Sequence, residues 1–170
     1  PPAGQVGPAQ IPTGYPRTPE GALGQLAAIE VAVLASMSIE TAHRVHEAWA
    51  APDAPAAEAW ALTANIQAFL ASTAGQRVGE RPAAVVVTPV AAQVKGTDGP
   101  DWVLACVLTQ VTATVVSTAR IGYGHCERMA WAGDRWVIAP GAPPAPAPST
   151  WPGTALARQA GWRTWIDSQG

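Results

Sequence analysis

Glu30 is the carboxylate in this sequence that is best placed for acid–base chemistry. It lies one helical turn after Leu26 and one turn before Leu34, in a stretch with almost no other charge, so a helix would turn it toward apolar neighbours. Burial raises the pKa of a carboxyl group, which is one way in which proteins make a general acid or base. A structural ion pair with Arg120 or Arg128 would use the same residue, and both interpretations stay open.

His125 and Glu127 form a second candidate pair. They share the parity of Met129 and Trp131 in a segment that is typical of a strand, so these side chains should lie on one face of a sheet. In one interpretation Glu30, His125 and Glu127 line a cone-shaped cavity, and Glu30 is the residue that transfers a proton.

His43, His46 and Glu47 have the spacing of metal ligands on a helix. One turn of helix rarely supplies a full coordination shell, so we expect these side chains to be solvated at the surface and predict no metal site. The sequence has no serine nucleophile elbow, phosphate-binding loop, CxxC or HExxH motif. We therefore predict no cofactor, and no motif names a reaction.

Cys106 and Cys126 allow one disulfide. Both lie in strand-like sequence, where a free thiol has no evident ligand partners, so a disulfide and therefore an oxidising compartment are favoured. Parity places Cys126 beside Arg128, on the opposite face from His125. If the two cysteines faced each other in a simple hairpin, its turn would fall near Val116, where the sequence has no turn residues. A bridge therefore requires a bulge or a pairing between non-adjacent strands.

The composition limits the partners. Only 13% of the residues are charged, against about 25% in an average protein, and the formal net charge is -2. No basic stripe is present to attract phosphates, so we expect no nucleic-acid partner. A length of 170 residues is typical of one domain.

The elements that must position these residues fall into two groups. Thr18 and Pro19 predict the start of a helix over residues 19–36, Ser38 caps a second helix, and a third covers residues 55–73 and stops near Gly75. Three runs rich in β-branched residues follow and predict strands. The first begins at Ala83, the second covers residues 102–121, and the third covers residues 126–139. The strands are grouped after the helices, so the predicted fold class is α+β, with helices on one face of a strongly curved antiparallel sheet.

A two-residue turn at Gly133 and Asp134 predicts a hairpin, because glycine comes first as a type II′ turn prefers. It pairs Trp131 with Trp136 and Met129 with Ile138, and the two indoles should form a stacked pair in the core.

Residues 140–150 are rich in proline and predict an extended arm. A short helix follows, with three tryptophans at Trp151, Trp162 and Trp165. We expect this arm and helix to cover the outer face of the sheet; the alternative is a docking peptide for another protein.

Residues 1–17 predict a flexible linker because they are rich in proline and glycine. We expect a membrane anchor or secretion signal upstream of residue 1. The alternative is a cytosolic protein with a flexible start.

Helices on a curved sheet that ends in WAGDRWVI resemble the nuclear transport factor 2-like fold of ketosteroid isomerases, polyketide cyclases and many non-enzymatic domains. The resemblance covers residues 18–140, with residues 1–17 as linker and residues 141–170 as proline-rich arm and helix. The junction GYPRTPEGA, in which the matching residues are Gly14, Tyr15, Pro16, Thr18, Glu20, Gly21 and Ala22, is similar to that of actinobacterial membrane-anchored proteins encoded with conjugation-type secretion ATPases.

The resemblance implies a non-enzymatic, extracytoplasmic scaffold domain of a conjugative or type IV secretion apparatus. Its partners would be other proteins of that membrane complex, with self-association left open, and a segment upstream of residue 1 would hold it at the membrane. The alternative that the resemblance leaves open is a small-molecule isomerase, cyclase or ligand-binding protein that uses the cone cavity.

Overall fold

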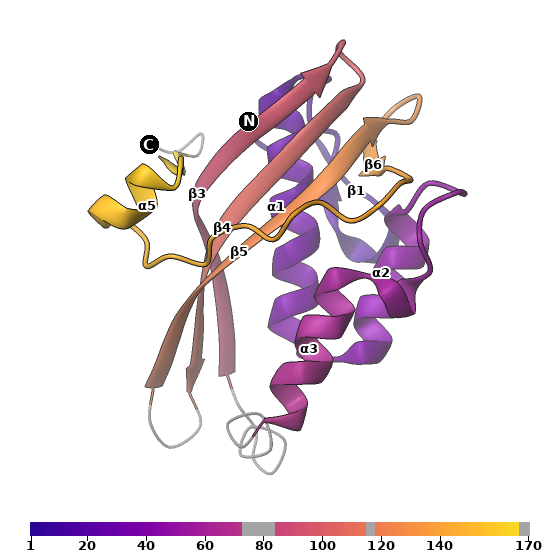
Figure 1. The fold of residues 1–170 in the computed structure, drawn as a ribbon. Helices are drawn as coiled ribbons and strands as arrows, with labels where there is room; N and C mark the ends of the chain where they lie inside the picture. The colour runs from indigo at the N-terminus through magenta and orange to yellow at the C-terminus, as the bar shows by residue number, and fades with distance from the viewer. Residues whose placement is uncertain (73–83, 115–117, 167–170) are drawn as a thin grey trace.

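The computed structural model describes residues 1–72, 84–114 and 118–166. In these residues the fold is α+β, with three α-helices on one side of a five-stranded antiparallel sheet and a short fourth α-helix on the other side (Figure 1). The helices in the described residues are α1 (Pro19–Ser36), α2 (Ile39–Trp49), α3 (Ala61–Ala71) and α5 (Ala155–Gln159). The sheet has the order β6-β5-β4-β3-β7, with β3 (Ala84–Asp98), β4 (Trp102–Thr114), β5 (Thr118–Trp131), β6 (Trp136–Ile138) and β7 (Arg163–Thr164).

The first two helices begin where the sequence predicts. Thr18 accepts a hydrogen bond from the Gly21 amide at 3.1 Å, and Ser38 accepts one from Thr41 at 3.2 Å, so each helix has a side-chain cap. The third begins later than predicted. A 3₁₀ turn, η2 (Ala57–Ala59), and the extended backbone of Trp60 precede α3; the predicted end at Thr73 and Gly75 lies outside the described residues.

The predicted strand over residues 102–121 is wrong, because the structure divides it between β4 and β5. Val111 and Ile121 are partners across this pair of antiparallel strands, and Thr114 pairs with Thr118. Nothing in the sequence marks a turn there, since residues 115–117 contain no glycine, proline or asparagine. The expected alternation of a buried and a wetter face still holds across the two strands, because residues that pair directly lie on the same face of the sheet.

The expectation of a bulge or non-adjacent pairing for the cysteines is also wrong. Cys106 and Cys126 are direct partners in β4 and β5, joined by a disulfide. The register runs without a shift from Trp102 to Thr114. A long ladder with a buried face on each side fixes register more strongly than the local chemistry of the turn does. Val116, where that turn would fall, lies outside the described residues.

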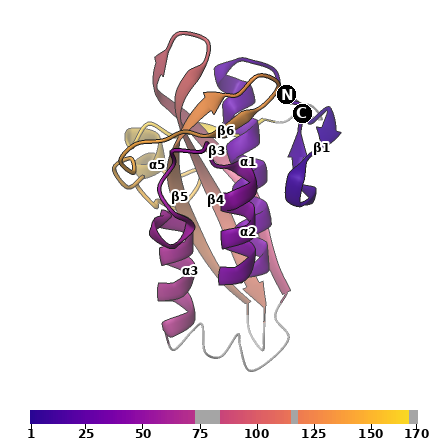
Figure 2. The same cartoon turned by 90° about the vertical axis from the view of Figure 1, so that its right-hand side faces the viewer.

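The sheet separates two apolar clusters. Helices α1, α2 and α3 cover one face (Figure 2), where α1 packs against β3, β4 and β5. The residues of β5 that point to this face are the odd-numbered ones, such as Met129, which is fully buried in the larger cluster. The even-numbered Cys126 belongs to the smaller cluster on the outer face. Two register shifts in β3, at Pro89/Ala91 and Val94/Gly96, are the kind of irregularity that bends a strand.

The hairpin that joins β5 to β6 has the predicted pairing. Trp131 lies opposite Trp136 and Met129 opposite Ile138, and Gly133 has the positive φ of 77° that its position in the turn requires. The two indoles meet edge to face rather than stacked, with ring centroids 5.5 Å apart and planes at 76°.

Residues 1–17 differ from the predicted flexible linker. They contain a hairpin of two short strands, β1 (Gln5–Val6) and β2 (Pro12–Thr13), on either side of the 3₁₀ turn η1 (Pro8–Gln10). Ile11 is fully buried, and Thr13 donates to Gln25 of α1 at 2.7 Å. The composition of residues 1–17 hides this because their packing rests on two buried residues, Ile11 and Thr13.

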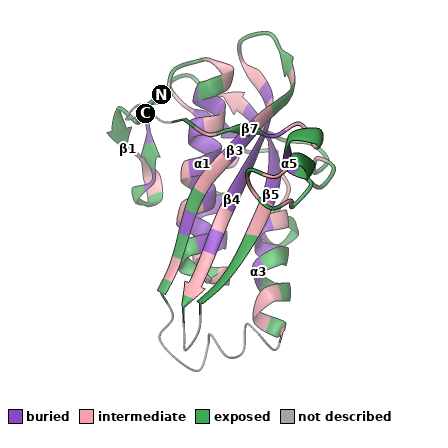
Figure 3. Cartoon of the chain, turned by 90° about the vertical axis from the view of Figure 1, so that its left-hand side faces the viewer, coloured by how far each residue is buried: buried purple, intermediate pink, exposed green. Residues whose placement is uncertain are grey.

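The chain after β6 crosses the outer face of the sheet and reaches its other edge at β7 (Figure 3). Trp162 is buried in the outer cluster and donates a hydrogen bond from its indole to the Pro148 carbonyl at 3.0 Å. The other two tryptophans that the sequence assigns to this contact lie elsewhere. Trp151 is 48% exposed, and Trp165 packs against the larger cluster on the helical side.

Candidate functional site

A cleft of about 260 Å³ lies between the helices and the edge of β5. Its helical wall includes His46, Trp60 and Asn65, its floor comes from β5, and residues 141–147 form the third side. Here β5 is an edge strand, since β6 pairs with it only from Met129 onward. The cleft is therefore a place where polar side chains can be buried and still meet solvent.

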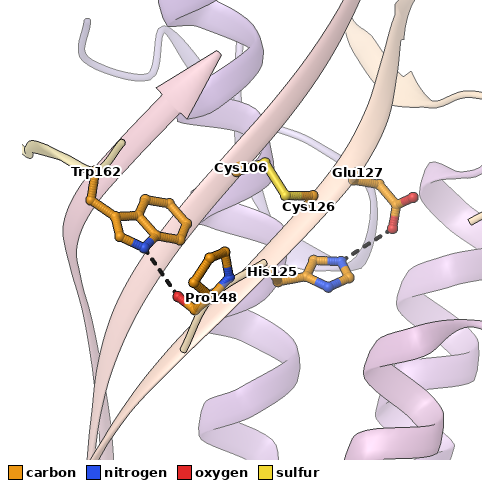
Figure 4. The surroundings of a disulfide bond; sticks show 6 residues. All are labelled: Cys106, His125, Cys126, Glu127, Pro148 and Trp162. Carbon is orange, nitrogen blue, oxygen red and sulfur yellow. Dashed lines mark hydrogen bonds and ion pairs between the residues drawn. A yellow bond between two sulfur atoms is a disulfide. The ribbon is translucent and has the colours of Figure 1, made fainter. Parts of the chain in front are cut away.

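His125 and Glu127 point from β5 toward the helices, away from the disulfide (Figure 4). Their side chains are 5% and 9% exposed, and Nε2 of His125 lies 3.2 Å from Oε2 of Glu127. The indole of Trp60 donates to the same oxygen at 2.9 Å. The structure thus brings together the predicted pair, and adds a third member from the helical layer.

Glu127 remains ionised in this setting. Its burial opposes ionisation, but the hydrogen bonds that it accepts, first from His125 and then from Trp60, outweigh burial and lower the pKa of Glu127. An ionised carboxylate can only accept, so Nε2 of His125 carries the proton in this hydrogen bond. In the neutral ring Nδ1 is then an acceptor. This atom has no partner among the described residues, and it is not sealed from solvent.

Tyr123 extends the site along β5. Its ring stacks on His125 with centroids 6.3 Å apart, and its hydroxyl accepts a hydrogen bond from Asn65 at 2.7 Å. Burial raises the pKa of Tyr123, with a further contribution from the charge of Glu30. The hydroxyl therefore keeps its own proton and can donate it into the cleft.

His46 does not lie in the solvated position that the sequence predicts. It is 4% exposed and packs at 5.1 Å from the ring of Trp60. Burial lowers the pKa of His46 although Glu127, Glu47 and Glu58 act in the opposite direction. Among the described residues, no group of three or more histidine, cysteine, aspartate or glutamate side chains could hold a metal ion.

Glu30 is buried as predicted, but it is separate from the cleft. It is fully buried on α1, is absent from the residues that line the cleft, and neither carboxylate oxygen has a hydrogen-bond partner in the described residues. Burial, and then the charge of Glu127, raise its pKa well above the ordinary value. The proposed ion pair does not form, because Arg120 and Arg128 have even positions on β5 and so point to the other face of the sheet.

Sequence reasoning missed Trp60, Tyr123 and Asn65. Trp60 and Glu127 are 67 positions apart, so no local motif joins them. A usable signal existed for Tyr123, which has the same parity as His125 and Glu127 and extends their row along the strand.

Comparison of the chain with models of protein families, with curated proteins and with solved structures finds no match. In the part of the chain that the structure describes, every helix is too short or too polar to cross a membrane.

Proposed function

We propose that this chain is a non-enzymatic assembly domain with a nuclear transport factor 2-like cone, held on the extracytoplasmic side of a membrane as part of a conjugative or type IV secretion-like apparatus. The observation that carries the proposal is the apolar packing between α1 and the sheet. Leu26, Ile29, Met129 and Trp136 are all fully buried there. Glu30, the residue on which proton transfer would depend, is itself fully buried and does not line the cleft.

Two further features support the proposal. The disulfide between Cys106 and Cys126 is a bond that persists in oxidising compartments and is rare in the cytosol. The register shifts in β3 also suit a closed cone, as do α1 packed on one face of the sheet and Ala147 of the proline-rich segment in the apolar cluster on the other face.

The first test is genetic. In a host that carries the natural full-length gene, deletion should lower the frequency of conjugative transfer, and re-expression should restore it. Glu30→Gln keeps the shape of the side chain and removes the acid, so an assembly domain with this change should restore transfer as well as the original does. Transfer that is indifferent to the deletion would exclude the assembly role.

The second test concerns location. Alkaline phosphatase folds to an active form only after export, so its fusion to the end of the full-length protein should be active. An inactive but intact fusion would place the domain in the cytosol.

Ligand binding is a second candidate function, and the cleft beside His125 and Glu127 favours it. Of the three residues suggested for an isomerase or cyclase, these two line the cleft and Glu30 does not. The cleft therefore supports ligand binding, and not catalysis that depends on Glu30. Loss of transfer in the Glu30→Gln variant, with normal folding, would instead support catalysis.

A further inference from the structure

The cleft contains ring nitrogens that have no hydrogen-bond partner among the described residues. The side chain of His125 is 5% exposed, and Nδ1 keeps contact with solvent instead of being sealed inside the protein. The side chain of His46 is also buried within the lining, and its ring nitrogens likewise keep contact with solvent. A neutral imidazole has one nitrogen that accepts a hydrogen bond, so each ring can accept one from a donor that enters the cleft.

The charges around the cleft favour a cation. The carboxylate of Glu127 lies on its floor, while Glu47 on α2 and Glu58 on η2 are exposed and near enough to His46 to influence its protonation. Arg128 also lines the cleft; its side chain extends toward Gly141 on the proline-rich wall, and Nη1 is buried without a hydrogen-bond partner among the described residues. The lining itself therefore holds one carboxylate and one guanidinium. Glu47 and Glu58, next in sequence to the lining residues His46 and Ala59, add negative charge beside it, and an excess of one sign of charge attracts ions of the other sign.

The walls suit an alkyl chain that ends in a charge. Trp60 and Tyr123 supply aromatic surface, to which a cation is attracted through the ring quadrupole. At about 260 Å³ the cleft falls just below the range of roughly 300–1,000 Å³ for drug-sized ligands. It therefore fits a single short chain rather than a ring system.

We propose that this cleft binds an alkylammonium group, carried either by a small organic amine or by a lysine side chain of another protein. The ammonium donates to Nδ1 of His125 and lies in the field of Glu127. The site goes beyond the assembly role and does not depend on it, since a free amine could bind to a domain of any function.

The experiment uses n-butylammonium chloride as the probe and nuclear magnetic resonance of the whole ¹⁵N-labelled chain as the readout. The indole N–H of Trp60 is the reporter, because it donates to Glu127; Trp60→Phe identifies its signal. We expect this signal to shift and saturate, with a Kd on the order of millimolar, which is reasonable for a ligand of so few atoms. Sodium chloride at equal ionic strength and n-butanol should leave the signal in place.

Variants test the roles of the charges. Glu127→Gln should weaken binding by at least about tenfold, as expected when a buried charge partner is lost. Because that variant can also disturb Trp60 and His125, a Glu47→Gln/Glu58→Gln double variant changes exposed residues alone and should weaken binding by about threefold, the scale of surface charge effects. Glu40→Gln, an equally exposed change on α2, should bind as the original chain does.

A second ligand identifies the source of the amine. Nα-acetyl-lysine methylamide presents the same ammonium on a peptide backbone. Tighter binding than n-butylammonium assigns the cleft to lysine side chains, and weaker binding assigns it to free amines. The proposal is overturned if n-butanol shifts the reporter as much as n-butylammonium does. It is equally overturned if the double variant binds like the original chain. A reporter signal that does not saturate up to tens of millimolar n-butylammonium would also overturn it, because general Coulomb attraction to the surface would explain such a shift without a site. None of these outcomes bears on the transfer assay.

Discussion

The indole of Trp136 donates a hydrogen bond to the carbonyl of Pro16 at 2.9 Å, across 120 positions of sequence. It joins the β6 hairpin to the segment that leads into α1. The same carbonyl lies 1.8 Å from where a β-carbon on Gly21 would be, so only glycine fits at that turn of the helix. The sequence features behind the two resemblances, the GYPRTPEGA junction and the hairpin in WAGDRWVI, are thus in contact.

Trp136→Phe should lower the free energy of unfolding by about 1–3 kcal/mol, because the Pro16 carbonyl loses its buried partner. Denaturation by urea measures this. Trp131→Phe is the matched control, since the indole of Trp131 bonds to the Gly133 carbonyl at an exposed site and its loss should cost less. Equal losses in the two variants would mean that the contact with Pro16 contributes nothing specific.

Gly122→Ala should loosen the segment that crosses the outer face. A β-carbon at Gly122 would lie 2.4 Å from the Thr150 carbonyl oxygen, so the segment must shift away, at a cost of about 1–3 kcal/mol. Hydrogen exchange should become faster at Ala157 and Trp162. Gly96→Ala has open space around its new methyl group and is the control. Unchanged exchange would show that the crossing segment is not held at Gly122.

Removal of the disulfide by the Cys106→Ala/Cys126→Ala double change should destabilise the domain by about 3 kcal/mol, the entropy of closing a loop of this length in the unfolded chain. The sequence separation of the two cysteines is 20. Thermal unfolding in the oxidised and double-variant forms gives the difference. A thiol assay on denatured, unreduced protein should find both cysteines blocked, and two reactive thiols would contradict the bridge.

Glu30→Gln should change how stability depends on pH. The pKa of Glu30 is raised in the folded state above its ordinary 4.5, so the folded chain holds this proton more tightly than the unfolded chain does. The free energy of unfolding should therefore fall as the pH rises from about 4.5 toward the folded pKa. In the glutamine variant this decline disappears. At pH 4 the two proteins should be similarly stable, and at pH 8 the variant should be the more stable.

Urea denaturation at both pH values checks this prediction, with Glu20→Gln on the exposed side of α1 as control. Glu127 has the opposite effect, since its pKa is lowered and its contribution is lost at low pH. It is present in both proteins and so does not alter the comparison. A variant that is less stable than the original at pH 8 would show that Glu30 is ionised and paired.

Local signals predicted much of this fold. Thr18 and Ser38 as caps located two helices, and Gly133 with Asp134 located a hairpin, because each acts through neighbours in sequence. The turn between β4 and β5 has no such signal. The register of the β4–β5 pair depends on many contacts between residues far apart in the sequence, including the disulfide. These contacts cannot be predicted from the local sequence.

The candidate site was predictable only in part. Parity placed His125 and Glu127 on one face, which the structure agrees with, but whether Glu30 shares their cavity depends on how α1 and α3 pack. Gly122 and Gly124 carried an overlooked signal. Glycine weakens a strand unless a backbone approaches closely, and at these two positions the backbone around Pro148 and Thr150 does so.

The disulfide also determines how far this chain can be stretched. Cys106 and Cys126 stand opposite each other in neighbouring strands, so a pull on the two ends passes through the sulfur atoms and bypasses the residues between them. An extended chain spans about 3.5 Å per residue, and the bypassed length is therefore about 70 Å. Pulling on the two ends would thus release less length when the domain unfolds, and the residues between the two cysteines would stay tethered to each other.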